Sequence, residues 1–252
     1  MVNQVDYPEI PADGYLDLHC HILPGVDDGC RDLTESLDVV QRWVRQGVHG
    51  AVCTPHVCTT WFPDNTPDKI TGWVTALQTA LDAAEIPFRL WPGGEVRLAE
   101  STIEWFGTYG VPTIGPGRAV LIDWWGRDWP TCCNTTIDWL QQEGFQPVLA
   151  HPERMGLEEA ELEAVIEELR QRGVWLQGNL NSLGGGEGVA AQRRADTWLA
   201  AGKYHLLASD SHGPSGIDGR AAGLARVREQ YGEATVTTLL IERTRAVMTW
   251  GL

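Results

Sequence analysis

Short runs of apolar and β-branched residues alternate along the chain with longer stretches in which apolar residues recur every three or four positions. The short runs are typical of buried strands and the longer stretches of amphipathic helices, so the pattern predicts repeated βα units and a parallel sheet or barrel. The predicted strands are Tyr15–Leu18, Gly50–Cys53, Phe88–Trp91, Ala119–Ile122, Pro147–Ala150, Val174–Gln177 and His205–Ala208.

Helices are predicted between these strands. Leu33, Leu37 and Val40 recur at helical spacing directly after Asp32, and Asp32 with Glu35 forms a capping-box pattern that favours a helix N-terminus. No low-complexity linker divides the chain, so we expect one α/β domain over residues 1–252 that forms a closed or nearly closed barrel. The other predicted helices are 162–169, Asp68–Glu85, Thr135–Glu143, Ala190–Ala201, Gly219–Tyr231 and a segment near the C-terminus.

Composition and charge exclude several classes of protein. The 252 residues include 19 Lys+Arg and 34 Asp+Glu, a formal net charge of −15, and Lys69 and Lys203 are the two lysines. No dense cationic run is present to follow a nucleic-acid backbone or an anionic membrane. No long apolar run, signal-peptide pattern or CxxC pair is found. We therefore expect a cytoplasmic protein with no nucleic-acid partner and no stable membrane insertion.

Histidines and carboxylates gather at the carboxyl ends of the predicted strands. In a parallel barrel these ends meet at one mouth, so residues far apart in the sequence become neighbours. His49 and His205 fall outside the pattern, and we interpret them as ordinary packed or surface residues. The residues within it are His19, His21, Asp28, His56, Glu95, Asp123, His151, Asp210 and His212.

These nine groups predict a metal centre. Imidazole and carboxylate ligands without thiolates favour Mn²⁺, Fe or Zn²⁺, and their number exceeds what one ion needs, so several ions are expected. Such ions polarise a phosphoryl oxygen and lower the pKa of bound water. Arg154 and Arg220 are the cations best placed to bind a phosphate there, although a surface ion pair is an equal alternative for Arg220.

Five short motifs occur in order along the chain. They are Asp17-Leu-His-Cys-His-Ile-Leu-Pro-Gly-Val-Asp-Asp-Gly29, Thr54-Pro-His56, Gly94-Glu95, His151-Pro-Glu-Arg154 and Ser209-Asp-Ser-His212. In order and spacing they resemble the PHP (polymerase and histidinol phosphatase) superfamily. Together with Gln177-Gly-Asn-Leu-Asn-Ser-Leu183 they resemble its CpsB/CapC group of bacterial tyrosine-protein phosphatases, over about residues 15 to 250.

The resemblance implies a distorted seven-stranded (β/α)7 TIM-like barrel with three divalent ions, Mn²⁺ being expected first and Fe or Zn²⁺ being the alternatives. The family more often has Glu where this chain has Asp123, which reaches about one methylene less far. Arg154, Arg220, Asp210 and His151 are implied to carry the reaction, with the two arginines binding the phosphate. The implied ligands are His19, His21, Glu95 and Asp210 for one ion, Glu95, Asp123 and His151 for the second, and Asp28, His56 and His212 for the third.

The resulting hypothesis is hydrolysis of a phosphomonoester by metal-bound hydroxide. A phosphotyrosine protein is the expected substrate. The resemblance suggests an autophosphorylating tyrosine kinase of polysaccharide export as partner, and hence a role in capsular or exopolysaccharide biosynthesis. Three alternatives stay open: a histidinol-phosphate or other small-molecule phosphatase, a lysine-free amidohydrolase, and a catalytically silent metal-binding regulatory module. A phosphodiesterase is disfavoured by the acidic composition.

Aromatic residues follow two of the site motifs. They either form a rim that contacts a phenyl ring or simply pack in the core, and the sequence leaves both readings open. The native metal and the oligomeric state are also left open. The aromatic residues are Trp61, Phe62, Trp124, Trp125 and Trp129.

Overall fold

The computed structural model describes residues 7–252, and within them all paired strands are parallel. One sheet has the order β1-β2-β4, with β1 at Tyr15–Cys20, β2 at Val48–Cys53 and β4 at Arg89–Pro92. The other has the order β3-β5-β6-β7-β8-β9, at His56–Val57, Glu95–Arg97, Ala119–Asp123, Gln146–Ala150, Trp175–Asn179 and Leu206–Ala208. The predicted α/β class with parallel strands is therefore confirmed.

Each of the seven predicted strands is present, but the described residues contain two further short strands. β3 and β5 follow β2 and β4 after breaks at Thr54–Pro55 and Gly93–Gly94. Backbone hydrogen bonds continue across both breaks, since Gly93 N–H donates to the Cys53 carbonyl at 2.9 Å and Glu95 N–H donates to the Pro55 carbonyl at 3.1 Å. Strands of two and three residues are too short to show an alternating pattern in the sequence.

The first and last strands of the described chain also meet. An isolated parallel bridge pairs Cys20 with Ser211. Beside it, His21 N–H donates to the Ser211 carbonyl and Asp210 N–H donates to the His19 carbonyl, each at 2.8 Å. These bonds place the end of β1 next to the segment that follows β9.

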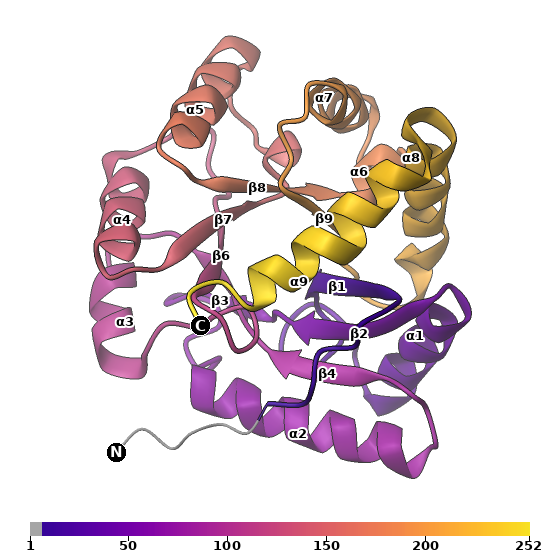
Figure 1. The fold of residues 1–252 in the computed structure, drawn as a ribbon. Coiled ribbons are helices and arrows are strands. Elements are labelled where there is room, and N and C mark those ends of the chain that lie inside the picture. Colours follow the sequence, from indigo (N-terminus) through magenta and orange to yellow (C-terminus); the bar gives the residue numbers. More distant parts are fainter. Residues whose placement is uncertain (1–6) are drawn as a thin grey trace.

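The helices lie outside the strands, and α9 crosses one end of them (Figure 1). Asp32 caps α1 by accepting a hydrogen bond from Glu35 N–H at 3.0 Å, as its sequence pattern predicts. The short helices α3 and α6 were not predicted. The helices are α1 Leu33–Arg45, α2 Pro67–Ala83, α3 Thr102–Tyr109, α4 Thr131–Gln142, α5 Glu159–Gln171, α6 Leu180–Leu183, α7 Val189–Ala200, α8 Ile217–Thr237 and α9 Arg243–Met248, with short 3₁₀ turns at Pro152–Arg154 and Pro214–Gly216 and a π-helical turn at Thr238–Glu242.

Two apolar clusters form the core. The larger one packs the helices against the outside of the sheets. The smaller one fills the space between the strands, where Leu16, Leu121 and Val148 meet Val247 and Met248 of α9. α9 lies at the amino ends of the strands, where Arg118 N–H, directly before β6, donates to the Trp250 carbonyl at 2.7 Å. Among residues 7–252, none of the helices combines the length and the hydrophobicity that crossing a bilayer requires.

Candidate metal centre

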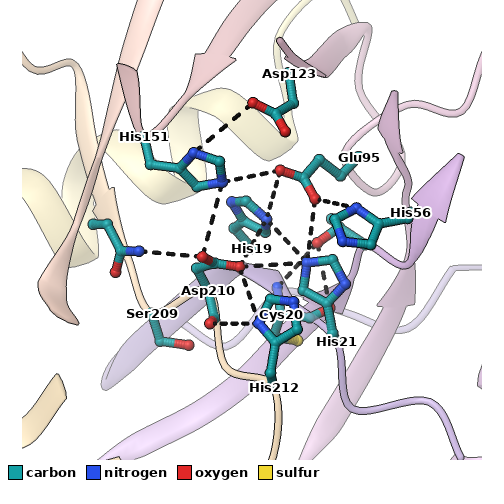
Figure 2. Close-up of polar contacts among 12 residues, drawn as sticks. His19, Cys20, His21, His56, Glu95, Asp123, His151, Ser209, Asp210 and His212 are labelled. Atoms are coloured by element: carbon teal, nitrogen blue, oxygen red, sulfur yellow. Dashed lines mark hydrogen bonds and ion pairs between the residues drawn. The ribbon is translucent and has the colours of Figure 1, made fainter. Parts of the chain in front are cut away.

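All nine predicted ligands lie together at the carboxyl ends of the strands. Figure 2 labels eight of them, and the ninth, Asp28, lies beside His56 and His212. The local structure explains their positions, because each follows or ends a buried strand. Six of them line an open cavity of about 290 Å³ together with Trp124, Trp125 and Arg154. The elements that supply the ligands are β1 for His19, the loop after β1 for His21 and Asp28, β3 for His56, β5 for Glu95, β6 for Asp123, the residue after β7 for His151, and the segment after β9 for Asp210 and His212.

Glu95 lies at the centre of the cluster and approaches four imidazoles. Its Oε1 atom is 3.0 Å from His151 Nε2 and 3.4 Å from His19 Nε2. Its Oε2 atom is 2.7 Å from His56 Nδ1 and 3.3 Å from His21 Nε2. Each carboxylate oxygen therefore faces two imidazoles.

Asp210 and Asp28 connect the remaining histidines. Asp210 Oδ1 lies 3.4 Å from His19 Nε2, His21 Nε2 and His212 Nδ1. Asp28 Oδ1 is 3.3 Å from both His56 Nε2 and His212 Nε2. Asp210 therefore connects His19 and His21 to His212. Asp28 connects His212 to His56.

Asp123 is more distant from its neighbours. Its Oδ1 atom is 3.9 Å from His151 Nδ1, and its other oxygen accepts a hydrogen bond from the Trp125 indole N–H. Although aspartate is shorter than the glutamate that the family more often has at this position, the Asp123 carboxylate therefore still faces His151.

The donor atoms fit bound metal ions. Four overlapping sets have donor atoms within 4.8 Å of one another. Buried His56 Nδ1, Glu95 Oε2 and Asp210 Oδ1 make no hydrogen bond, although each lies close to other donors. Close approach without hydrogen-bond geometry is expected for ligands of a shared ion. The sets are His21, Asp28, His56 and His212; His19, His21 and Glu95; His19, His151 and Asp210; and Glu95, Asp123 and His151.

Opposite charges within the cluster outweigh the effect of burial on most of its pKa values. Burial by itself would lower the pKa of His56, but Glu95 and Asp28 raise it to about 10. Burial likewise opposes the charged form of His151, yet Asp123 and Glu95 raise its pKa to about 9. For Asp123, burial and then Glu95 raise the carboxyl pKa. Divalent ions would replace the protons that these imidazoles otherwise hold.

Two further residues orient the ligand imidazoles, and sequence reasoning assigned them no role. Asp27 Oδ2 lies 2.7 Å from His21 Nδ1 and accepts the His56 N–H at 3.0 Å. Gln177 Oε1 lies 2.9 Å from His19 Nδ1. A metal-ligating histidine usually donates its second ring N–H to such an oxygen, which fixes the tautomer. Asp27 and Gln177 both lie inside motifs that carry the family resemblance. This position is the one sequence signal that could have indicated their role.

The two predicted phosphate-binding arginines lie in different places. Arg154 lines the cavity, where Nη1 pairs with Asp210 Oδ2 and Nε is 3.5 Å from Glu187 Oε2. Arg220 is buried outside that cavity, and its guanidinium donates to the backbone carbonyls of Ser209 and Asp210. In this geometry Arg154 faces the mouth, whereas Arg220 holds the turn after β9.

Two ligands have left-handed backbone conformations that side chains other than glycine rarely adopt. The φ angle is 28° at His151 and 49° at Asp210. Such conformations cost on the order of 1 kcal/mol or more each and concentrate at functional sites. At Asp210 the cost is offset by hydrogen bonds to its carbonyl from Arg220 and, at 3.1 Å, from His212 Nδ1. In this backbone conformation both side chains lie in the cluster, His151 next to Glu95 and Asp210 next to His19.

The predicted aromatic residues lie at or behind the mouth. Trp124 and Trp125 line the cavity, and Trp61 stacks on Trp125 with ring centroids 5.1 Å apart. Phe62 stacks on the His56 ring at 5.7 Å, whereas Trp129 packs edge-on against Trp124 at 6.5 Å.

The two excluded histidines lie away from the cluster. His49 Nδ1 is 3.4 Å from Asp13. The His205 ring stacks on Trp175 at 3.9 Å.

Comparisons with known proteins identify a matching family and similar bacterial proteins. Residues 15–249 match the family described as capsular polysaccharide synthesis, CpsB/CapC. Tyrosine-protein phosphatase YwqE of Bacillus subtilis (strain 168) is 29% identical over 197 residues, 78% of this chain and 77% of the relative. Tyrosine-protein phosphatase CpsB of Streptococcus agalactiae is 27% identical over 245 residues, 92% of this chain and 98% of the relative.

A solved structure extends the similarity to three dimensions. It comes from work on YwqE of Bacillus subtilis and CpsB of Streptococcus pneumoniae, described there as unique metal-dependent tyrosine phosphatases. It superimposes with a TM-score of 0.82 at 26% identity and covers 92% of this chain and 94% of that chain.

Proposed function

Because the chain belongs to the CpsB/CapC family, we propose that it is a metal-dependent phosphatase that hydrolyses phosphotyrosine in proteins. The carrying observation is the set of overlapping ligand clusters beside Arg154 in one open cavity. The similarity to tyrosine-protein phosphatases along most of the chain supports this choice of substrate.

We propose that the site binds three divalent ions, with Mn²⁺ first and Fe or Zn²⁺ as alternatives, and the overlapping groups of imidazole and carboxylate donors support several ions. When bound, such ions polarise a phosphoryl oxygen and lower the pKa of bound water. Asp123 approaches its neighbours less closely than Glu95 does, so its set is proposed to bind its ion most weakly. One donor group, Glu95 with Asp123 and His151, coincides with a proposed set, whereas the other groups overlap the proposed sets in part. The proposed ligands are those that the family resemblance implies: His19, His21, Glu95 and Asp210; Glu95, Asp123 and His151; and Asp28, His56 and His212.

The protein's own groups are proposed to bind and orient the phosphoryl group. The Arg154 guanidinium faces the cavity and can donate two parallel hydrogen bonds to phosphoryl oxygens. His151 and Asp210 are proposed to support turnover by holding the centre together. A role of Arg220 in phosphate binding stays a prediction, and its contacts support a role in fixing the Asp210 turn.

The leaving group suits an aromatic ester. A tyrosine phenol has a pKa of about 10, so it leaves more readily than an aliphatic alcohol and needs less help from a general acid. Trp124 and Trp125 provide an aromatic wall beside the phosphate position. These features favour phosphotyrosine over phosphoserine.

The proposal also covers the arrangement of the strands, the partner protein and the cellular location. We propose one domain in which both sheets form a single distorted seven-stranded barrel, supported by the hydrogen bonds across the strand breaks and the Cys20–Ser211 bridge. The family's link to capsular polysaccharide synthesis supports a capsule-related tyrosine kinase as partner. A cytoplasmic location follows from that partner in this proposal.

Phosphate release tests the proposed function. The purified protein is compared on a phosphotyrosyl peptide, an aliphatic phosphomonoester and a phosphodiester, with Mn²⁺ and with chelator. We expect selective, chelator-sensitive release from the phosphotyrosyl peptide. A preference for the aliphatic ester would favour a small-molecule phosphatase, and no metal-dependent release from any ester would favour a silent module.

Substitution of two ligands tests the site. His151→Ala and Asp210→Ala should each lower turnover by at least about 100-fold while the circular dichroism spectrum stays unchanged. His49→Ala is the matched control, because His49 lies away from the cluster. Near-native turnover by either ligand variant would contradict the site assignment.

A further inference from the structure

Beside the cavity lies a group of three side chains, of which the proposed function uses only Trp125. Trp61, Arg97 and Trp125 form a stack, which we call the aromatic lip. The Trp61 and Trp125 rings are 5.1 Å apart and inclined by 20°. The Arg97 guanidinium carbon lies 4.4 Å from the Trp61 ring and 4.8 Å from the Trp125 ring. Cation–π attraction therefore holds the charge against both indoles.

The lip is open to solvent although it is aromatic. Trp61 is 58% exposed and Trp125 is 38% exposed. Large exposed aromatic surfaces are typical of places where a partner binds. Trp125 also lines the cavity and contacts the His56 ring edge-on at 5.0 Å, so the lip continues directly from the proposed phosphate position.

Arg97 carries a charge that no carboxylate of residues 7–252 neutralises through an ion pair. Its Nη1 atom contacts the Cys58 sulfur at 3.7 Å, and its buried Nε–H makes no hydrogen bond. In a chain with a formal net charge of −15, this guanidinium, which lies against the cavity-lining Trp125 ring, is a local positive site. An anionic group of the substrate would give Arg97 the ion-pair partner that residues 7–252 do not supply.

We propose that the aromatic lip binds the peptide part of the substrate, with the phosphotyrosyl ring against Trp125 and a neighbouring acidic side chain against Arg97. The inference rests on the proposed function and adds sequence preference to it. A phosphoseryl residue has no ring for the indole face. A neutral neighbour gives Arg97 no partner. The preferred substrate is therefore a phosphotyrosine flanked by Asp or Glu.

Two substitutions separate the ring from the charge. Trp61→Ala removes half of the stack but touches no proposed ligand, whereas Arg97→Met keeps an unbranched side chain over the rings and removes its charge. Trp250→Ala is the matched control, because Trp250 is 45% exposed and lies at the other end of the strands, beside Arg118. Trp125 itself is left unchanged, since its indole N–H donates to Asp123.

The readouts are binding and turnover. Binding of a non-hydrolysable phosphonate analogue is measured by calorimetry on peptides with Glu or Gln beside the phosphotyrosine mimic. We expect Trp61→Ala to weaken binding of both peptides about three- to tenfold. Arg97→Met should remove a preference of about threefold or more for the Glu peptide. Release from a small aliphatic phosphomonoester should change less than about twofold in both variants.

Failure of the inference differs from failure of the proposed function. Unchanged peptide binding in both variants, with wild-type activity intact, would overturn the role of the lip. Equal losses on the peptide and on the small ester would also overturn it, because the variants would then act on the metal centre. Wild-type protein that releases no phosphate from any phosphotyrosyl peptide would instead overturn the proposed function.

Discussion

The Tyr204 hydroxyl starts a chain of buried hydrogen bonds that ends at a proposed metal ligand. It donates to Glu153 Oε2 at 3.0 Å, and Glu153 Oε1 accepts the Asn179 N–H at 2.8 Å. The Asn179 side-chain amide then donates to Asp210 Oδ2 at 3.2 Å. Burial raises the pKa of the Glu153 carboxyl, and burial and then Glu153 raise that of Tyr204 well above its usual value, so the phenol stays a donor.

Tyr204→Phe removes the first donor of this chain. Tyr204 is 2% exposed and Glu153 is fully buried, so no water replaces the lost hydroxyl. Leaving such an acceptor unpaired costs about 1.5 to 3 kcal/mol of unfolding free energy. For a chain of this size the expected fall in melting temperature is about 3 to 12 °C.

Thermal and urea unfolding measure the effect, with chelator present to separate it from metal binding. Tyr231→Phe is the matched control, because its hydroxyl is 3.4 Å from the Asp196 carbonyl and the residue is only partly buried. We expect that control to change stability by less than about 0.5 kcal/mol. Glu153→Gln combined with Tyr204→Phe should cost at least about 0.5 kcal/mol less than the sum of the single variants.

Three results would refute this reasoning. Tyr204→Phe could match the wild type within about 0.5 kcal/mol, which would mean that the carboxylate does not depend on the hydroxyl. The control at Tyr231 could cost as much, which would point to a general effect of removing a phenol. Strict additivity with Glu153→Gln would show that the two groups are not coupled.

Two further predictions concern orientation of a ligand and acid stability. Asp27→Asn should weaken Mn²⁺ binding about 10- to 100-fold, because Asp27 orients His21. The affinity is measured against a competing chelator, with Asp64→Asn at an exposed position as the control. An Mn²⁺ affinity equal to that of the wild type would contradict this prediction. Burial and Arg243 lower the His205 pKa from 6.5 to about 4, so the unfolded chain binds the proton more tightly and stability falls as pH drops through this range. His205→Phe, which keeps the stack on Trp175, should remove about 1 kcal/mol of the loss of unfolding free energy between about pH 7 and 5, and an unchanged loss would contradict it.

Sequence reasoning located the seven predicted strands because their apolar runs are long enough to show. It missed β3 and β5, which have two and three residues, and the short helices α3 and α6. Local pattern does not specify β3 and β5, because they depend on hydrogen bonds to neighbouring strands. The helices α3 and α6 span eight and four residues, too few to show a clear helical repeat of apolar positions.

The ligand positions were predictable for a different reason. Parallel strands bring their carboxyl ends together, so position along a strand is enough to place His56 or Glu95 near the other ligands. The roles of Asp27 and Gln177 depend on which side-chain oxygen faces which ring nitrogen. Arg220 shows the same limit, since its distance from His212 in the sequence does not indicate on which side of the turn its guanidinium lies.

The contact between the end of β1 and the segment after β9 determines when the proposed metal centre can form. His19 and His21 leave the ribosome before Asp210 and His212, which lie about 190 residues later and reach them only across the Cys20–Ser211 bridge. Contacts of such long sequence separation form slowly, because chain closure must precede them. During synthesis His19 and His21 therefore stay without these partners until the segment after β9 has been made, and the full set of proposed ligands exists only once the fold has closed.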